Sequence, residues 1–252
     1  MLMSQGLHHL VKKGNLLRVR ELLSASPPEK IDLNAYDRSG HTPLMHAAKS
    51  PKANVELVRL LLDHGANVHQ ESRARYGAGQ SVVALSVAGG DPRKVAALIE
   101  NGADIHYKRA EGYDALIDAV FGQRDVSRDP QLIDLLKLLT ARGVALSTVT
   151  SYGQSGLCAL SQLGRFDAVQ LLLDAGADAT HLEWTPLIQA VALGSLADVA
   201  EVVESGANLE EKDRLERTAW VVAIQTGDRA KARFLLERGA LGLRPPEKVL
   251  YR

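Results

Sequence analysis

The chain has 252 residues, of which 46% are hydrophobic and 24% are charged. This balance is that of a folded chain and excludes a disordered one, which would be poor in apolar residues. Thirty Lys and Arg residues balance thirty Asp and Glu residues, so no excess of positive charge indicates contact with a phosphate backbone. We therefore expect no nucleic-acid partner.

The first thirteen residues indicate a cytoplasmic protein. They carry charged and histidine side chains where a secretory signal needs an apolar core. No apolar run reaches the roughly 18 residues needed to cross a bilayer. Cys158 is the single cysteine and cannot form an internal disulfide. The sequence predicts a chain in a reducing compartment, with no membrane association.

The first predicted elements are two helices, beginning at about Leu7. Gly14 and Asn15 form the turn between them, and Val19, Leu22 and Leu23 lie in the second helix. The pattern then starts again with Thr42, Pro43 and Leu44, which are typical of a helix start because Thr caps a helix and Pro fits its first turn.

The second predicted helix pair shows the features of each later one. Ala47 and Ala48 are small enough for two helices to pack closely, and residues 55–62 place apolar side chains at helical spacing. Gly65 then ends the second helix, because Gly adopts the left-handed conformation at low cost. The same Leu- or Val-rich phrase followed by Gly recurs at a period near 33 residues, ending at Gly65, Gly102, Gly143, Gly176, Gly206 and Gly239.

A regular period of this length predicts a repeat architecture, because one helix pair cannot bury its apolar face alone and must stack on its neighbours. Residues 37–48 resemble the opening motif of the ankyrin repeat, with Met45 where that family usually has His. The resemblance covers almost the whole chain. It implies an all-α solenoid forming a single domain over residues 1–242, with a tail at 243–252. The seven expected repeats lie near residues 4–36, 37–71, 72–108, 109–149, 150–180, 181–212 and 213–242.

The third and fourth repeats carry extra residues. The third has a long opening loop at residues 73–80. The fourth has about eight extra residues between its helices, and we expect residues 122–129 to be a mobile or partner-contacting loop outside the core. Asp129 and Pro130 are expected as the cap and first residue of the following helix.

The chain lacks the usual catalytic and metal-binding motifs. It holds no Gly-x-x-x-x-Gly-Lys phosphate loop and no His-Glu-x-x-His zinc helix. His41 and His46 are spaced by five, one beyond the spacing that puts two ligands on one helix face, and His64 and His69 have the same spacing. We interpret them as turn and surface residues and Cys158 as a packing residue, and we expect no metal and no cofactor.

In the ankyrin family the opening loops and first helices line a concave face, and the resemblance implies the same surface here. Four of the eleven aromatic residues fall on variable positions of that face in three adjacent repeats, which is typical of a binding hot spot. The expected partner-binding residues are Tyr113, Phe121, Tyr152, Gln154, Gln162, Leu163, Trp184, Leu193 and Arg217.

These features predict a non-catalytic scaffold that binds another protein and is a monomer on its own. It would serve as an inhibitor, such as an immunity protein that blocks a toxin or enzyme. An adaptor or an effector's targeting module is the alternative within the same class. An enzyme or metal-binding sensor that uses the histidines and Cys158 is the alternative from a different class.

Overall fold

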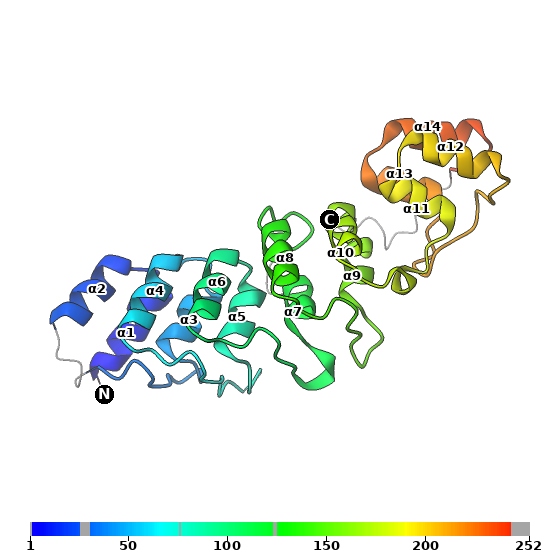
Figure 1. Ribbon diagram of the computed structural model, residues 1–252. Coiled ribbons are helices and arrows are strands. Elements are labelled where there is room, and N and C mark those ends of the chain that lie inside the picture. The colour runs from blue at the N-terminus through cyan, green and yellow to red at the C-terminus, as the bar shows by residue number, and fades with distance from the viewer. Residues whose placement is uncertain (1, 26–30, 76, 123–124, 243–252) are drawn as a thin grey trace. The chain divides into compact units, whose positions relative to one another are not determined.

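The computed structural model describes residues 2–25, 31–75, 77–122 and 125–242 (Figure 1). Within those ranges the chain is helical, and its one strand-like pairing is an isolated bridge between Glu71 and Ser81. The predicted all-α class is confirmed. The expected tail, 243–252, lies outside the described residues.

The described helices form seven successive pairs, joined by loops. The first helices of the pairs are α1 (Leu2–Lys12), α3 (Pro43–Lys49), α5 (Val82–Gly89), α7 (Ala115–Phe121), α9 (Gly156–Gln162), α11 (Pro186–Leu193) and α13 (Ala219–Thr226). The second helices are α2 (Leu16–Ala25), α4 (Val55–Asp63), α6 (Pro92–Glu100), α8 (Leu132–Ala141), α10 (Phe166–Asp174), α12 (Leu196–Glu204) and α14 (Arg229–Glu237). Two short 3₁₀ helices, η2 (Ala110–Gly112) and η3 (Ala179–Leu182), lie in the opening loops.

The chain divides into two compact units, residues 1–153 and 154–252, called unit 1 and unit 2 below. The division falls inside the fifth expected repeat. Its opening residues, 150–153, belong to unit 1, whereas both of its helices belong to unit 2.

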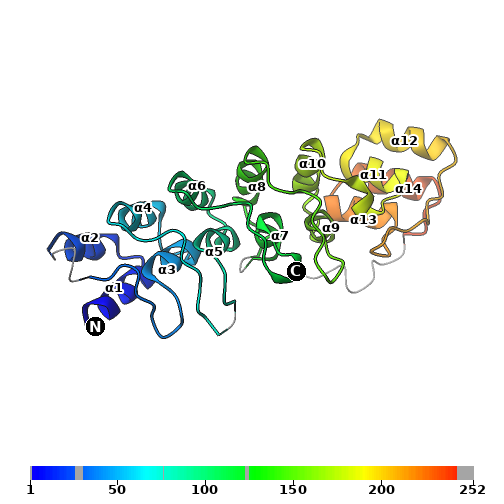
Figure 2. The same cartoon turned by 60° about the horizontal axis from the view of Figure 1, so that its bottom comes forward.

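Unit 1 contains two parallel rows of helices. The first helices α1, α3, α5 and α7 pack side by side, and the second helices α2, α4, α6 and α8 form the other row (Figure 2). Small residues let the first row pack closely: a Cβ atom on Gly122 would lie only 2.5 Å from the carbonyl oxygen of Ala88 in α5. A larger residue at position 122 would force these two helices apart.

Capping residues, several of them predicted from the sequence, set many of the helix boundaries. Thr42 and Thr185 each accept a hydrogen bond from the backbone N–H three residues later, at 3.3 and 3.1 Å, which satisfies a donor that the helix cannot pair internally. Ser81 does the same for α5. Gly65 has a φ of 91° after α4, as expected of a residue that ends a helix in the left-handed region.

The fourth repeat differs from the sequence prediction in two ways. Asp129 accepts a hydrogen bond from the N–H of Gln131, but α8 begins only at Leu132, two residues later than expected. Val126 is 3% exposed, so the expectation that residues 122–129 lie wholly outside the core is wrong. An apolar side chain within the insertion packs inward, whereas residues 123 and 124 lie outside the described part of the chain.

Two buried lysines connect neighbouring repeats. Lys94 of α6 donates hydrogen bonds to the carbonyl oxygens of Ala47 and Ser50, at 3.1 and 2.6 Å. Lys231 of α14 does the same for Val191 and Gly194, at 2.9 and 2.7 Å. The last carbonyls of α3 and α11 have no partner inside their own helices, so each lysine satisfies them from the following repeat.

Unit 2 contains a different arrangement between its first two repeats. α11 to α14 form two tightly packed pairs around a core that includes Ile188, Val191, Val222 and Leu235. α10 packs against α11 and α9 packs against η3, whereas α9 and α11 share no contact comparable to those between first helices in unit 1. An opening is nevertheless lined by residues of α10 and α11.

Removal of a buried leucine from a second helix will measure how much that helix stabilises unit 2. Leu172 is fully buried in α10, so Leu172→Ala should lower the free energy of unfolding by about 2–5 kcal/mol, because it removes apolar contacts and leaves a cavity. Urea unfolding followed by circular dichroism measures this. Leu196→Ala, at a leucine that is 42% exposed, should change stability by less than about 0.5 kcal/mol. Equal losses for both variants would contradict the placement of Leu172 in the core.

Candidate functional site

The expected partner-binding residues of unit 1 lie at or near the surface. Phe121 is 39% exposed and Tyr152 is 67% exposed. A hydrogen bond and the negative charge of Glu111 raise the pKa of Tyr152. Tyr113 is half-buried, and the guanidinium carbon of Arg109 lies 5.0 Å from its ring centre, which is the geometry of a cation–π contact. These three rings keep surface that a partner can reach.

The expected residues of unit 2 divide into two groups. Gln154, Gln162 and Leu163 are exposed, whereas Trp184 and Leu193 are half-buried. Trp184 packs against the core of unit 2, with its ring centre 6.0 Å from that of Phe166. Its indole N–H is buried without a hydrogen-bond partner in the described structure. Trp184 therefore contributes to packing. The expectation that its ring lies wholly outside the core is wrong.

Arg217 is not a surface residue, because its side chain is 1% exposed. Its guanidinium donates to Asp213 Oδ2 at 2.6 and 2.9 Å, to the carbonyl and hydroxyl oxygens of Ser161 at 2.8 and 2.7 Å, and to Gln225 at 3.0 Å. The expectation that Arg217 faces a partner is wrong. A buried guanidinium needs a full set of acceptors, and here they tie the last opening loop to α9. In the sequence, the four-residue spacing of Asp213 and Arg217 was the feature that could have indicated a pairing of these two charges.

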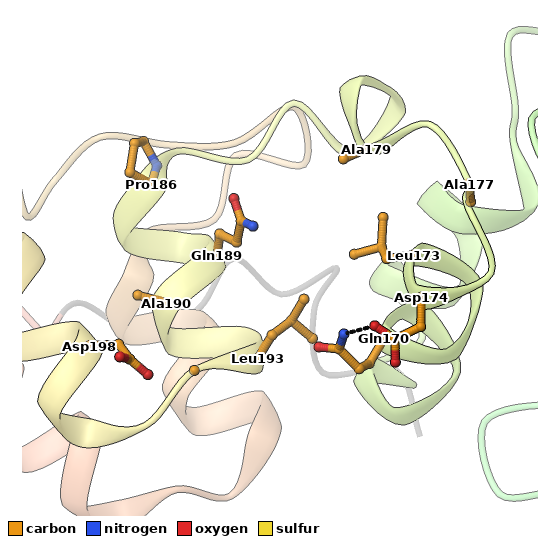
Figure 3. Close-up of a pocket in the computed structure, with 11 residues that line it drawn as sticks. Gln170, Leu173, Asp174, Ala177, Ala179, Pro186, Gln189, Ala190, Leu193 and Asp198 are labelled. Atoms are coloured by element: carbon orange, nitrogen blue, oxygen red, sulfur yellow. Dashed lines mark hydrogen bonds between the residues drawn. The ribbon is translucent and has the colours of Figure 1, made fainter.

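The opening between α10 and α11 is a groove of about 590 Å³ within unit 2 (Figure 3). Leu173 of α10 and Leu193 of α11 lie on its two sides, and polar side chains are interspersed with them. Of the expected site residues only Leu193 lines it. The lining residues are Gln170, Leu173, Asp174, Ala177, Ala179, Pro186, Gln189, Ala190, Leu193, Gly194 and Asp198.

The charge of this groove is negative, because its lining includes two carboxylates and no Lys or Arg. Asp174 accepts a hydrogen bond from Gln170 at 2.6 Å. Asp198 accepts from the backbone N–H and the hydroxyl of Ser195 at 2.6 and 2.8 Å, and these bonds lower its pKa. Sequence reasoning missed the groove, because it arises from the way two repeats meet and not from any local motif.

A second candidate site is a buried cluster of polar side chains in unit 1. His41 and His46 are 7% and 5% exposed, and their ring centres are 5.2 Å apart. The interpretation of these two histidines as turn and surface residues is wrong. The two rings meet because His41 ends an opening loop while His46 lies on the first helix that follows it, so the five-residue spacing spans a loop and a helix and not one helix face.

Asp37 is the centre of this cluster. Its Oδ1 accepts hydrogen bonds from the N–H and hydroxyl of Ser39 and from the N–H of His41. Its Oδ2 accepts from Lys12 at 2.6 Å and lies 2.9 Å from Nε2 of His46. Burial acts to raise the pKa of Asp37, but these hydrogen bonds together hold it well below its usual range. The carboxyl is therefore ionised.

The two histidines are in their neutral form near pH 7. Burial lowers the pKa of His46 to about 4, although the carboxylate of Asp37 opposes this shift. Burial and the positive charge of Lys49 lower the pKa of His41. In both cases the cause is the loss of water around the charged imidazolium.

Cys158 lies on α9 and is half-buried. Burial raises the pKa of its thiol, although Arg214 and Arg217 act in the opposite direction. A raised pKa disfavours the thiolate, which is the reactive form. The position does not favour a catalytic cysteine.

The Arg217 contacts can be tested by truncation. Arg217→Ala should destabilise the chain by about 3–5 kcal/mol, because it leaves the fully buried carboxylate of Asp213 without its charged partner. Arg214→Ala removes an exposed arginine of the same loop, paired at 3.6 Å with Glu183, and should cost at most about 1 kcal/mol. Thermal unfolding of both variants compares them. If the two variants unfold at the same temperature, the buried pair does not hold the loop.

The depressed pKa of His46 predicts a loss of stability in acid. Between an unfolded-state pKa of 6.5 and a folded-state pKa of about 4, the unfolded chain binds a proton that the folded chain does not. The unfolding free energy should therefore fall as pH falls through this window, by about 3 kcal/mol for this group. Urea unfolding at pH 7 and pH 4.5 measures the slope, which His46→Gln should flatten. The exposed His64, changed to Gln, is the control; equal slopes for His46→Gln and the parent chain would refute the assignment.

Comparison with known proteins gives the family. A family model described as "Ankyrin repeats (3 copies)" matches residues 4–72, 126–213 and 158–244. Over 178 residues, 68% of this chain, the sequence is 30% identical to "Ankyrin repeat and SAM domain-containing protein 6" of Danio rerio. Over 180 residues, 70% of this chain, it is 29% identical to "Ankyrin repeat protein nuc-2" of Neurospora crassa. The matched regions are 21% and 15% of those proteins, so the chain corresponds to a small part of each.

A solved structure agrees with these matches. The ankyrin repeat domain of Bcl-3, described as a unique member of the IkappaB protein family, is 26% identical, with a TM-score of 0.55 over 92% of this chain and 97% of that domain. No described helix is both long and apolar enough to cross a membrane. Ankyrin repeat domains are generally protein–protein interaction modules and are typically non-catalytic. The sequence matches, the helix pairs and the structural likeness together place this chain in the ankyrin repeat family.

Proposed function

We propose that this chain is a non-catalytic module that binds another protein and that the groove between α10 and α11 is its principal contact. The observation that carries the proposal is the groove itself, which combines half-buried leucines with two carboxylates in a recess of about 590 Å³. Apolar surface that stays open to solvent between polar groups is typical of an interaction site.

The groove fits a partner segment of a particular chemistry. Leu173 and Leu193 favour an apolar side chain at its centre, and Asp174 and Asp198 favour Lys or Arg on either side of that side chain. The amides of Gln170 and Gln189 provide donors and acceptors for a peptide backbone. A basic segment with an apolar residue at its middle satisfies all of these groups, whereas an acidic segment would place like charges together.

The exposed and half-buried residues at the surface outside the groove are proposed as secondary contacts. In unit 1 these are the rings of Tyr113, Phe121 and Tyr152, and in unit 2 they are Gln154, Gln162 and Leu163. Large rings give contact area at low entropic cost. Trp184 is retained as a contact only for the part of its ring that the core leaves uncovered. Arg217 is withdrawn from the surface, because its donors are already used.

The role of this binding is proposed from the sequence, which has no phosphate-loop or zinc-helix motif and has equal numbers of basic and acidic residues. We infer a cytoplasmic monomer that inhibits its partner, as an immunity protein does to a toxin. An adaptor or targeting module would use the same surface but would leave the partner's activity unchanged. Addition of purified chain to the captured partner in an activity assay separates the two roles, because only an inhibitor abolishes turnover.

The groove is tested by substitution of one leucine that lines it and one that does not. Leu193→Arg should weaken partner binding at least about 10-fold, equivalent to about 1.4 kcal/mol, because it places a cation and extra volume in the apolar part of the groove. Leu236→Arg, at a leucine on α14 that is 46% exposed, is the matched control and should bind as the parent chain does. Asp174→Lys should weaken binding of a basic partner and reduce its dependence on salt.

The partner is first isolated with a photo-crosslinking residue at position 189, and affinities are then measured by interferometry on the purified pair. Circular dichroism verifies that each variant is folded. If Leu193→Arg and the parent chain bind the partner equally well, the groove is not the contact. If Leu236→Arg alone loses binding, the contact lies on the surface around α14.

A further inference from the structure

We propose that Asp37, His41 and His46 form a binding site for a zinc-like divalent transition-metal ion in unit 1. Each residue offers one ligand atom, and these atoms all lie within 4.8 Å of one another. The site is independent of the groove, which lies in unit 2.

The donor set suits zinc. Two imidazole nitrogens and one carboxylate oxygen are among the ligand combinations that zinc accepts, with a solvent molecule in the fourth tetrahedral position. Bonds of about 2.0–2.1 Å place neighbouring ligand atoms about 3.3 Å apart. Nε2 of His46 lies 2.9 Å from Oδ2 of Asp37, close to this separation, and no two of the three ligand atoms are more than 4.8 Å apart.

The surrounding hydrogen bonds orient the ligands. The hydroxyl of Ser39 lies 2.6 Å from Oδ1 of Asp37 and 3.2 Å from Nδ1 of His41. One side chain thereby holds Oδ1 of Asp37 and Nδ1 of His41, so Oδ2 of Asp37 and Nε2 of His41 are the atoms that Ser39 does not contact. Such hydrogen bonds to the outer atoms of metal ligands fix their orientation and strengthen binding.

Two ammonium groups contact ligand residues of the proposed site. Nζ of Lys12 is 2.6 Å from Oδ2 of Asp37, and Nζ of Lys49 is 3.3 Å from Nε2 of His41. In the metal-free chain they supply the positive charge that the ion would bring. The Lys12 side chain is 45% exposed, so it can move into solvent when an ion displaces it. The two lysines therefore compete with the metal and lower its affinity.

The chain contains its own control for this site. His64 and His69 have the same five-residue spacing, but both are exposed. Nδ1 of His64 lies 2.8 Å from the carbonyl oxygen of Leu60 at the end of α4. A metal that binds exposed histidines without selectivity would use this pair as readily as the buried one.

The test is a Zn²⁺ titration of the full chain without an affinity tag, by calorimetry at pH 7.5, with Co²⁺ absorption to report tetrahedral geometry. The parent chain should bind one ion, and saturating Zn²⁺ should raise its unfolding temperature. His41→Gln and His46→Gln should each lower the association constant at least about 10-fold. The double variant of His64 and His69 to Gln should bind as the parent chain does.

Lys12→Met keeps all three ligands and removes one competitor, so it should bind Zn²⁺ more tightly than the parent chain. Tighter Zn²⁺ binding cannot result from misfolding. The Lys12→Met variant therefore tests the proposal even if a histidine variant fails to fold. The proposal is overturned if the parent chain binds no ion, if binding is lost with His64 and His69, or if Lys12→Met binds Zn²⁺ no more tightly than the parent chain.

Discussion

The structure depends on one constraint, which is that a pair of helices of seven to eleven residues has too little apolar surface to fold alone. Each pair must therefore cover the face of the next. Close contact between first helices requires small side chains, and Gly122 shows the limit, with no room for a Cβ atom beside Ala88. Close contact also buries carbonyl groups at helix ends that have no partner within the helix. Lys94 and Lys231 donate hydrogen bonds to such carbonyls from the following repeat. Apolar packing and the pairing of these carbonyls thus both hold each repeat against its neighbour.

The opening loops are held by buried polar groups whose chemistry differs from repeat to repeat. In the second repeat the carboxylate of Asp37 receives Lys12 and lies against His46. In the fourth, Asp118 on α7 receives the guanidinium of Arg109 and the hydroxyl of Tyr107. The structural requirement is the same in each case, since a buried charge needs partners. Several combinations of side chains can pair a buried charge. The combination in the second repeat also has the donor atoms of the proposed metal site.

The groove arises where the stacking changes. In unit 1 the first helices form a continuous row, whereas in unit 2 the fifth repeat meets the sixth through α10 and η3. Arg217 reaches Ser161 of α9 from the last opening loop, so a residue that a regular stack would present to a partner is used to hold α9. Arg217 is buried, and an open groove lies between α10 and α11. Both features lie in unit 2, where the stacking departs from the continuous row of unit 1.

The sequence by itself determined the helix pairs, their order and several of their ends, because the 33-residue period, the Thr caps and the terminal glycines act over a few residues each. It also placed Phe121 and Tyr152 at positions that the structure leaves exposed. The tertiary structure decided the rest. Whether Arg217 is buried, whether Val126 packs inward, and whether His41, His46 and Asp37 meet depends on distances between segments that local periodicity does not encode. Burial and charge pairing are properties of the packed neighbours, and only the folded chain brings those neighbours together.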